Sequence, residues 1–338
     1  MSAMAHLFRL SPLVPMKHET LLLAGMVFLA AAIPTAREQR VSLLPKLHSG
    51  QTLTYLIHYR ASKDVKTEST FAVPLAPTAS QVDAARLLRV EILDVQQIAG
   101  KPAIHARSGF ITPGSIETGP PGEQKLDAGQ SAALAAEIVE FTVAPDGSAE
   151  KITGLDALGT DEQEIWQEWL ARFAAAWTFP AQGAKIGDKW KADQLEQAAS
   201  PIAALSWIRD SAYVRNEVCR LPQLSAKGEI SPSSGPADTC AVILSTAKLI
   251  QKSSPKDATP EDFKLHKLKT MGSAKGANEI ITYISLTSGL VVRATEEASQ
   301  QMDVVIAKAD GSNRVHYAVD AKGNSEVLLV TEAPFTHP

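Results

Sequence analysis

Alternating apolar and polar positions, typical of β-strands with one buried face, recur along most of the chain. Residues 53–59 read Leu-Thr-Tyr-Leu-Ile-His-Tyr, and β-branched and aromatic residues of this kind favour strands. Residues 87–97 and 103–111 flank a Gly-containing turn, which predicts a hairpin. Residues 138–143 alternate again and are followed by a Pro-Asp-Gly turn and a short strand at 149–152. The first part of the chain is therefore predicted to form antiparallel β-structure.

A second β-rich stretch begins near residue 185. Its predicted strands are residues 278–286, 290–295, 299–308, 314–319 and 325–331. Turns are expected at Thr287-Ser288-Gly289, Asp310-Gly311 and Lys322-Gly323, because Gly, Asp and Ser favour turn conformations. These strands and turns predict an antiparallel meander.

The segment Gly272-Ser273-Ala274-Lys275-Gly276 has the glycines of a phosphate-binding loop. It lacks the full spacing of such a loop and the strand-to-helix context that the loop requires. We therefore interpret this segment as a hairpin turn.

One helix is predicted between the two β-rich stretches. Thr160 followed by Gln163 has the form of a capping box, and Pro180 and Gly183 are expected to end the helix. The residues between recur at helical spacing and form one apolar face: Ile165, Trp166, Trp169, Leu170, Phe173, Ala174 and Trp177. Such a face predicts a helix packed across a sheet, and the alternative is that its aromatic residues line a ligand groove. A shorter helix is predicted at 130–137.

These patterns predict a mainly β fold of the α+β class, with antiparallel sheets in two β-rich halves joined by an amphipathic helix. The predicted segments are a signal peptide at 1–36, a first β-rich half at 37–155, a linking helix at 156–180 and a second β-rich half at 181–338. Each half has a glycine just before its first strand and a late strand-turn-strand unit. This hints at two related halves, but a repeat would require clearer self-similarity.

The N-terminus has the three parts of a secretory signal peptide. Met16-Lys17-His18 supplies a positive start, residues 21–33 are almost unbroken apolar, and small residues follow up to Ala36. The apolar run is shorter than the roughly 20 residues that a membrane-spanning helix needs. We expect cleavage near Ala36, and the alternative is an uncleaved N-terminal anchor.

The chain has two cysteines, Cys219 and Cys240. In an oxidising compartment an even and minimal number of cysteines indicates one disulfide. The segment between them is rich in Ser, Pro and Gly, and a loop of this kind gains stability when its ends are linked. We therefore predict a Cys219–Cys240 disulfide, with two buried free thiols as the alternative.

Composition and charge exclude several classes of protein. The chain has 338 residues, of which 45% are hydrophobic and 21% charged, with a formal net charge of −4. Proteins that bind nucleic acids or anionic lipids carry clusters of Lys and Arg, and positive and negative residues are mixed here. We expect a globular exported chain with no nucleic-acid partner and no membrane span after cleavage.

The sequence contains no arrangement that is typical of a catalytic or metal site. The eight histidines are scattered, and His58, His105 and His316 are predicted to lie on sheet faces. No cluster of Cys or His could bind zinc. Ser253-Ser254-Pro255-Lys256 has the spacing of a serine acylase, but the partner motifs of that class are absent. Glu296 and Glu297 are neighbours on a strand, so they point to opposite faces. We expect no enzyme activity, no cofactor and no metal.

Two short motifs carry a resemblance to known proteins. Gly187-Asp188-Lys189-Trp190 opens a strand, and Thr287-Ser288-Gly289-Leu290-Val291 forms a late turn. With the signal peptide, these motifs resemble uncharacterised exported bacterial proteins and, more distantly, the lipoprotein-carrier superfamily of outer-membrane lipoprotein localisation. The carrier resemblance implies a curved antiparallel sheet that encloses an apolar cavity with helices. The apparent duplication departs from the single-sheet carrier pattern.

The function expected from these features is that of a periplasmic or secreted envelope protein that binds an apolar or amphipathic small molecule, such as a lipid. Pockets are mostly apolar, so the expected binding residues are Trp166, Trp169, Phe173 and Trp177. The alternative is a structural or assembly protein that binds another envelope protein through an apolar patch or an unpaired strand edge. A third alternative is a hydrolase whose catalytic residues come from distant strands.

Overall fold

The computed structural model describes residues 40–70, 78–111, 138–195, 200–225, 229–231 and 237–332. The predicted signal peptide and the predicted helix at 130–137 lie outside the described residues. None of the described helices is both long enough and apolar enough to cross a membrane.

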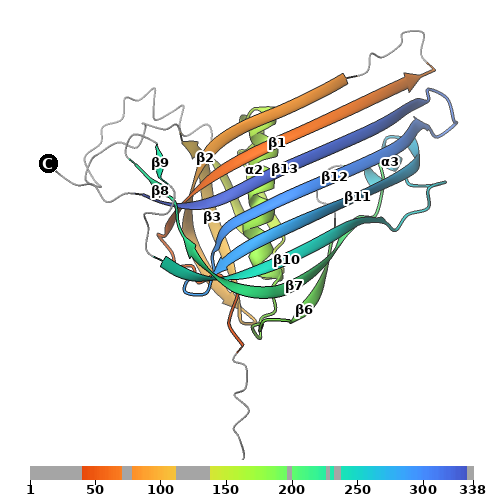
Figure 1. The fold of residues 1–338 in the computed structure, drawn as a ribbon. Coiled ribbons are helices and arrows are strands. Elements are labelled where there is room, and N and C mark those ends of the chain that lie inside the picture. The colour runs from red at the N-terminus through yellow and green to blue at the C-terminus, as the bar shows by residue number, and fades with distance from the viewer. Residues whose placement is uncertain are drawn as a thin grey trace, which may run out of the picture. The chain divides into compact units, whose positions relative to one another are not determined.

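Antiparallel strands make up most of the described chain (Figure 1). The strands before the main helix are β1 (Thr52–Ser69), β2 (Thr78–Ile98), β3 (Lys101–Ile111), β4 (Val139–Val143) and β5 (Ala149–Thr153). The helical segment consists of the 3₁₀ turn Leu155–Ala157, helix α2 (Thr160–Ala174) and the 3₁₀ turn Ala175–Thr178. The later elements are β6 (Lys189–Leu195), β7 (Leu205–Arg220), β8 (Gln223–Leu224), β9 (Ile230–Ser231), β10 (Ala237–Gln251), α3 (Glu261–Leu265), β11 (Leu268–Ser285), β12 (Val291–Lys308) and β13 (Val315–Glu332).

All the long strands belong to one sheet. Their order is β5-β4-β3-β2-β1-β13-β12-β11-β10-β7-β6, and β8 and β9 pair beside the end of β13. The strands that precede α2 and those that follow it therefore meet at the β1–β13 pair, which runs from Thr54 opposite Val330 to Ser69 opposite Val315. The predicted mainly β fold with antiparallel strands and an amphipathic helix is confirmed.

Helix α2 connects the two edges of this sheet. It follows β5 and precedes β6 in sequence, and these are the outermost strands of the sheet. The chain must therefore cross from one edge to the other, and α2 makes most of that crossing against the inner face of the curved sheet (Figure 1). We call this helix-covered side the inner face.

Aromatic side chains of α2 fill the space between the helix and the sheet. Trp166 and Trp169 pack edge-on against Phe141 of β4, with ring centroids 5.6 and 5.8 Å apart. Tyr55 of β1 contacts Trp169 and Phe173 at 5.8 and 6.1 Å. Trp169 is 0% exposed, so burial of these rings is a large part of the hydrophobic stabilisation.

The predicted cap of α2 is wrong by one residue. The N-cap is Gly159, and its backbone N–H donates to Oε2 of Glu162 at 3.2 Å. The Gln163 side chain reaches back instead to the carbonyl of Leu158 at 2.9 Å. The sequence allows either register because Glu162 and Gln163 are both suitable partners at this position in a capping box.

Two predicted turns are wrong because they lie inside long strands. Gly272 and Gly276 belong to β11, and Lys322-Gly323 belongs to β13. A Cβ on Gly272 would lie 2.2 Å from the carbonyl oxygen of Asp303, and one on Gly276 would lie 2.9 Å from the ring of Trp207. These two glycines permit close packing within the sheet rather than a change of direction.

The predicted disulfide is present. Cys219 of β7 and Cys240 of β10 are bonded, with Cα atoms 5.8 Å apart. The bond links neighbouring strands of the sheet and closes the chain segment between them.

We expect Trp169→Ala to lower the free energy of unfolding by about 3–5 kcal/mol, because it removes a fully buried ring from a packed aromatic cluster. Urea denaturation of the oxidised protein measures this change. The control is Leu265→Ala, because Leu265 is 80% exposed and its truncation should change stability by less than about 0.5 kcal/mol. Equal effects of the two substitutions would contradict the central role of the aromatic cluster.

Candidate functional site

A groove of about 700 Å³ runs over the part of the inner face that α2 does not cover. Most of its floor comes from alternate residues of β1, β12 and β13, since every second side chain of a strand points to the same face. The apolar floor residues include Val65, Ala298, Met302, Val304, Ile306, Tyr317, Val319 and Ala321. Lys63 and Gln300 also line the groove, which is therefore a mostly apolar surface inside the curve of the sheet.

Small residues in neighbouring strands deepen the groove next to the helix. Ala61 of β1 lies opposite Gly323 of β13, which lies opposite Ala298 of β12. A Cβ on Gly323 would approach nothing closer than the carbonyl oxygen of Arg60 at 3.9 Å. The space above this row is open because none of its three residues has a side chain larger than a methyl group.

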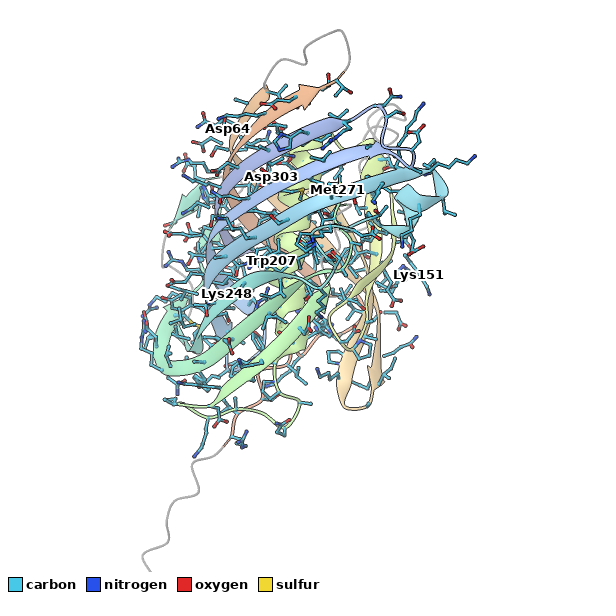
Figure 2. All side chains as sticks on the ribbon, turned by 90° about the vertical axis from the view of Figure 1, so that its right-hand side faces the viewer. Asp64, Lys151, Trp207, Lys248, Met271 and Asp303 are labelled. Atoms are coloured by element: carbon cyan, nitrogen blue, oxygen red, sulfur yellow. A yellow bond between two sulfur atoms is a disulfide. The ribbon has the colours of Figure 1, made fainter. Side chains whose placement is uncertain are left out.

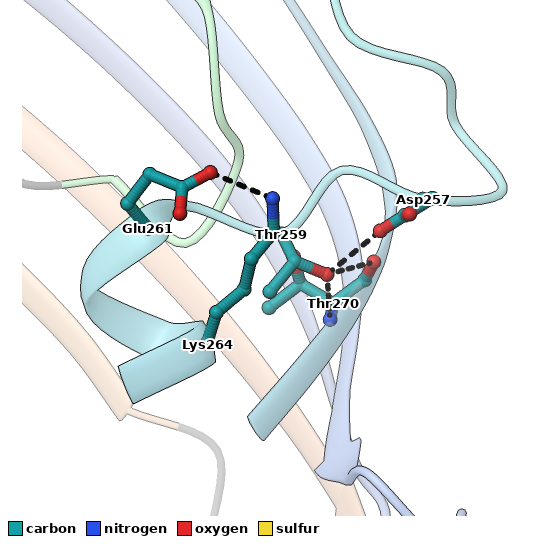
Figure 3. Close-up of polar contacts among 5 residues, drawn as sticks. All are labelled: Asp257, Thr259, Glu261, Lys264 and Thr270. Carbon is teal, nitrogen blue, oxygen red and sulfur yellow. Dashed lines mark hydrogen bonds and ion pairs between the residues drawn. The ribbon is translucent and has the colours of Figure 1, made fainter. Parts of the chain in front are cut away.

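One wall of the groove comes from the segment that connects β10 to β11. Phe263 of α3 and Trp207 of β7 line this side, and Figure 2 labels Trp207 on the inner side of the curved sheet. Thr259 fixes the segment to β11: its hydroxyl accepts from the N–H of Thr270 at 3.0 Å and donates to Asp257 at 2.9 Å (Figure 3). The position of Phe263 therefore depends on a local hydrogen-bond network.

A buried charged cluster closes the groove at the helix. Nη2 of Arg172 in α2 forms an ion pair with Glu296 of β12 at 2.8 Å, and its Nε lies 3.1 Å from Glu168. Ser325 of β13 donates to Glu168 at 2.6 Å, and Asn278 of β11 donates to Glu296 at 2.7 Å. Both carboxyl groups border the groove, so a mostly apolar surface ends in a fixed polar cluster.

The two carboxyl groups of this cluster hydrogen-bond to each other and titrate in opposite directions. The pKa of Glu296 is raised to about 7. Burial and the negative charge of Glu168 raise this pKa, and the positive charge of Arg172 offsets part of the increase. Burial acts the same way on Glu168, but Arg172 and the hydrogen bonds from Glu296 and Ser325 outweigh it and lower the pKa. Below about pH 7 the pair therefore holds one proton on Glu296 and one negative charge on Glu168.

Tyr59 and Glu164 extend the polar end of the groove. The Tyr59 hydroxyl lies 3.5 Å from Oε2 of Glu164, and both residues line the groove. Burial, followed by the nearby carboxylates of Glu164 and Glu168, raises the pKa of the Tyr59 hydroxyl. Tyr59 is therefore a neutral hydrogen-bonding group at neutral pH.

The aromatic residues expected to bind a ligand lie in the core between α2 and the sheet. Trp166, Trp169, Phe173 and Trp177 are at most 3% exposed. The indole N–H of Trp166 donates to Ser108 at 2.8 Å, and that of Trp177 donates to the carbonyl of Pro102. Their burial is accounted for by packing, and their role in ligand binding stays a prediction.

The other residues considered from the sequence form isolated surface or structural contacts. His105 pairs with Glu140 at 2.6 Å, and His316 pairs with Asp303 at 3.1 Å. The Ser253 hydroxyl donates to the carbonyl of Ala203 at 2.7 Å. Within the described ranges, no group of three or more His, Cys, Asp or Glu is placed to hold a metal ion.

Sequence reasoning missed the charged cluster, although a signal for it exists. Glu296 occupies an inward position in the alternation Ala294, Glu296, Ala298, where an apolar residue is expected. Glu168 and Arg172 are four residues apart beside the tryptophan face of the helix. A charged residue at an inward strand position, with a charged pair on the one amphipathic helix, could have suggested the contact.

The raised pKa of Glu296 predicts that stability falls as pH rises. The unfolded chain releases this proton near the ordinary pKa of 4.5, whereas the folded chain holds it to about 7. The free energy of unfolding should fall by about 3 kcal/mol across this window, because the folded state binds more protons there. Urea denaturation at a series of pH values measures the slope.

Glu296→Gln should flatten this slope, because the amide mimics the protonated carboxyl group. Glu297→Gln is the matched control, since Glu297 is exposed on the opposite face of the same strand and should leave the slope unchanged. An unaltered slope in the Glu296 variant would show that another group carries the titration.

No protein-family model matches the chain, and no curated protein matches its sequence. A candidate exported protein with a YmcC-like fold from Bacteroides fragilis NCTC 9343 has a TM-score of 0.24 and 9% identity, covering 82% of this chain and 97% of that one. A candidate lipoprotein from Parabacteroides distasonis ATCC 8503 has a TM-score of 0.21 and 8% identity, covering 87% and 99%. Similarities this low carry no argument about fold or function.

Proposed function

We propose that the chain is an exported envelope protein that binds an elongated apolar or amphipathic molecule in the groove of the inner face. The observation that carries this proposal is the groove itself, which has a volume of about 700 Å³ and a largely apolar floor. Ligand pockets typically have volumes of about 300–1,000 Å³ and apolar linings with a few polar groups. The groove has this size and this distribution of polarity.

The polar end of the groove supports an amphipathic ligand rather than a purely apolar one. Val304, Ile306 and Val319 line the part remote from α2, whereas Glu164 and Glu168 line the part beside it. A chain of methylene groups would bury apolar surface along the part of the groove that is remote from α2. A polar head group would then lie within reach of the fixed carboxyl groups.

Export is supported by two independent features of the chain. The N-terminal pattern is that of a secretory signal peptide, and Cys219 and Cys240 form a disulfide. Disulfides persist in oxidising compartments such as the bacterial periplasm. Both features are expected of a protein that acts outside the cytoplasm.

We also propose that the polar cluster orients a ligand instead of performing catalysis. Glu168 and Glu296 are both in contact with Arg172 and with each other. A general acid or base must reach the substrate proton directly, and these contacts occupy much of the hydrogen-bonding capacity of the two carboxyl groups. Their geometry is better suited to a fixed polar wall.

Native mass spectrometry of the protein purified from the periplasmic fraction tests both parts of the proposal. We expect a mature mass two hydrogen masses below the reduced chain, together with a bound small molecule that is lost on denaturation. An oligomer whose mass includes no bound small molecule would favour the alternative of an assembly protein that binds another envelope protein. A chain retained in the cytoplasm would contradict export.

Filling the groove should abolish ligand binding without unfolding the protein. Ala321→Phe places a ring on the groove floor of β13, so we expect loss of the co-purified molecule and of fluorescence enhancement with the apolar probe N-phenyl-1-naphthylamine. Ala318→Phe is the matched control, because it adds the same ring to the opposite face of the same strand. Equal binding by the two variants would contradict the groove as the site.

A further inference from the structure

A second cavity of about 710 Å³ lies on the other side of the charged cluster. Its walls come from α2, β5, β7, β11 and β12, and it shares Glu168, Trp207, Glu296 and Ala298 with the groove. Two arginines, Arg172 and Arg209, line it. The charged cluster therefore borders both the mostly apolar groove and a cavity that contains guanidinium groups.

Both arginines are buried and have polar atoms without hydrogen-bond partners. Arg172 is 5% exposed and Arg209 is 8% exposed. Among the described residues, no partner contacts Nη1 of Arg172 or Nε of Arg209. Nε and Nη2 of Arg172 contact Glu168 and Glu296, whereas no ion pair is formed by Arg209 within the described part of the chain. Nε of Arg209 is thus a buried donor without a hydrogen-bond partner among the described residues, although burial lowers the pKa of Arg209 and the nearby carboxyl groups of Glu168 and Glu296 offset part of that decrease.

The charges around the second cavity do not balance at mildly acidic pH. Arg172 and Arg209 supply two positive charges, and Glu168 supplies one negative charge. Glu296 has a pKa of about 7 and is therefore protonated and neutral at mildly acidic pH. Burial and the like charge of Arg172 lower the pKa of Arg209 to about 10, so Arg209 stays protonated at neutral pH.

An unpaired buried guanidinium is costly, because burial removes its hydration without replacing it. The Nε of Arg209 and the Nη1 of Arg172 come from two different elements, β7 and α2. Planar guanidinium groups bind the oxygens of carboxylates and phosphates strongly, often through paired hydrogen bonds. One oxyanion in the cavity would supply both the missing charge and the missing acceptors.

We propose that the second cavity is an oxyanion-binding site in which Arg209 and the unpaired Nη1 of Arg172 bind a carboxylate or phosphate group. The unpartnered Oδ1 of Asn278, which also lines the cavity, would accept a hydrogen bond from a hydroxyl carried by the same ligand or from water. The oxyanion is either a free ion or the acidic head group of an amphiphile whose chain occupies the groove. This second form rests on the proposed function of the groove.

The site has a built-in dependence on pH. The charged or titratable groups that line it are Glu168 and Arg172 from α2, Arg209 from β7 and Glu296 from β12. The lining residues from β5 and the preceding turn are uncharged: Gly147, Ala149 and Ile152. When Glu296 loses its proton the net positive charge disappears, so oxyanion binding should weaken as pH rises through about 7.

Isothermal titration calorimetry of the full exported chain with four probes tests the proposal. The probes are inorganic phosphate, dodecanoate, dodecyl phosphate and dodecan-1-ol, each added to the wild-type protein and to Arg209→Gln. We expect Arg209→Gln to weaken binding of at least one anionic probe by about tenfold or more, since hydrogen bonds to charged groups are lost. Binding of dodecan-1-ol should be unaffected.

Two further variants separate binding from folding. Arg215→Gln is the matched control, because Arg215 is an exposed residue of the same strand that pairs with Glu217. In the absence of anion and below about pH 7, where Glu296 holds its proton, Arg209→Gln should have a midpoint of thermal unfolding equal to or above that of the wild type, because it removes the excess buried positive charge. Arg209→Lys should keep part of the anion affinity.

The four probes distinguish a free anion from the head group of an amphiphile, and they test the oxyanion site separately from the groove. Arg209-dependent binding of phosphate alone supports a free-ion site, and Arg209-dependent binding of the anionic amphiphiles alone supports a head-group site. Binding of dodecan-1-ol without any Arg209-dependent anion binding would overturn the oxyanion site and leave the groove proposal standing. Anion binding that does not increase with the alkyl chain would support the site and count against the groove.

Discussion

The fold and its groove depend on one constraint: helix α2 must cross the inner face to join the two edges of a single sheet. β5 and β6 are the outermost strands, and the chain between them is mostly helical. The crossing is stabilised by the aromatic cluster around Trp169, which stacks on Phe173 at 5.1 Å. Without these contacts the inner face of a long, twisted sheet would be exposed to water, which a large apolar surface disfavours.

The same constraint explains why a groove exists. A helix of 15 residues is about 22 Å long, whereas a strand of 18 residues such as β12 extends for about 60 Å. One short helix that crosses the sheet cannot cover strands of this length, so part of the inner face is left without a covering element from the described residues. Phe263 and Trp207 narrow this open part from one side, and the small residues Ala61, Ala298 and Gly323 keep it deep beside the helix.

The sequence predicts the local elements well and their assembly poorly. Alternation identified the strand around Tyr55 and the hairpin after residue 87, and helical spacing identified the tryptophan helix, because these signals come from burial of one face. The sequence did not show that β12 and β13 are continuous strands. Gly323 is a residue type that favours turns, and only the neighbouring strands show that it lies within a sheet. Pairing of β1 with β13 joins residues more than two hundred positions apart, and no local pattern encodes that contact.

The site was harder to predict than the fold because its chemistry arises from residues that contradict the pattern. An inward Glu296 is unfavourable alone, and it is tolerated because Arg172 of α2 and Asn278 of β11 contact it. Replacing such a buried ionic group with apolar residues is often neutral or stabilising, so packing alone gives little reason to keep Glu168, Arg172, Arg209 and Glu296 together.

The position of this charged cluster between two cavities gives a functional reason. The cluster provides a polar boundary for an apolar groove on one side, and on the other side it presents guanidinium donors that the protein itself leaves partly unpaired. A sequence selected only for stability would have removed that imbalance, and a sequence selected to bind an oxyanion would retain it.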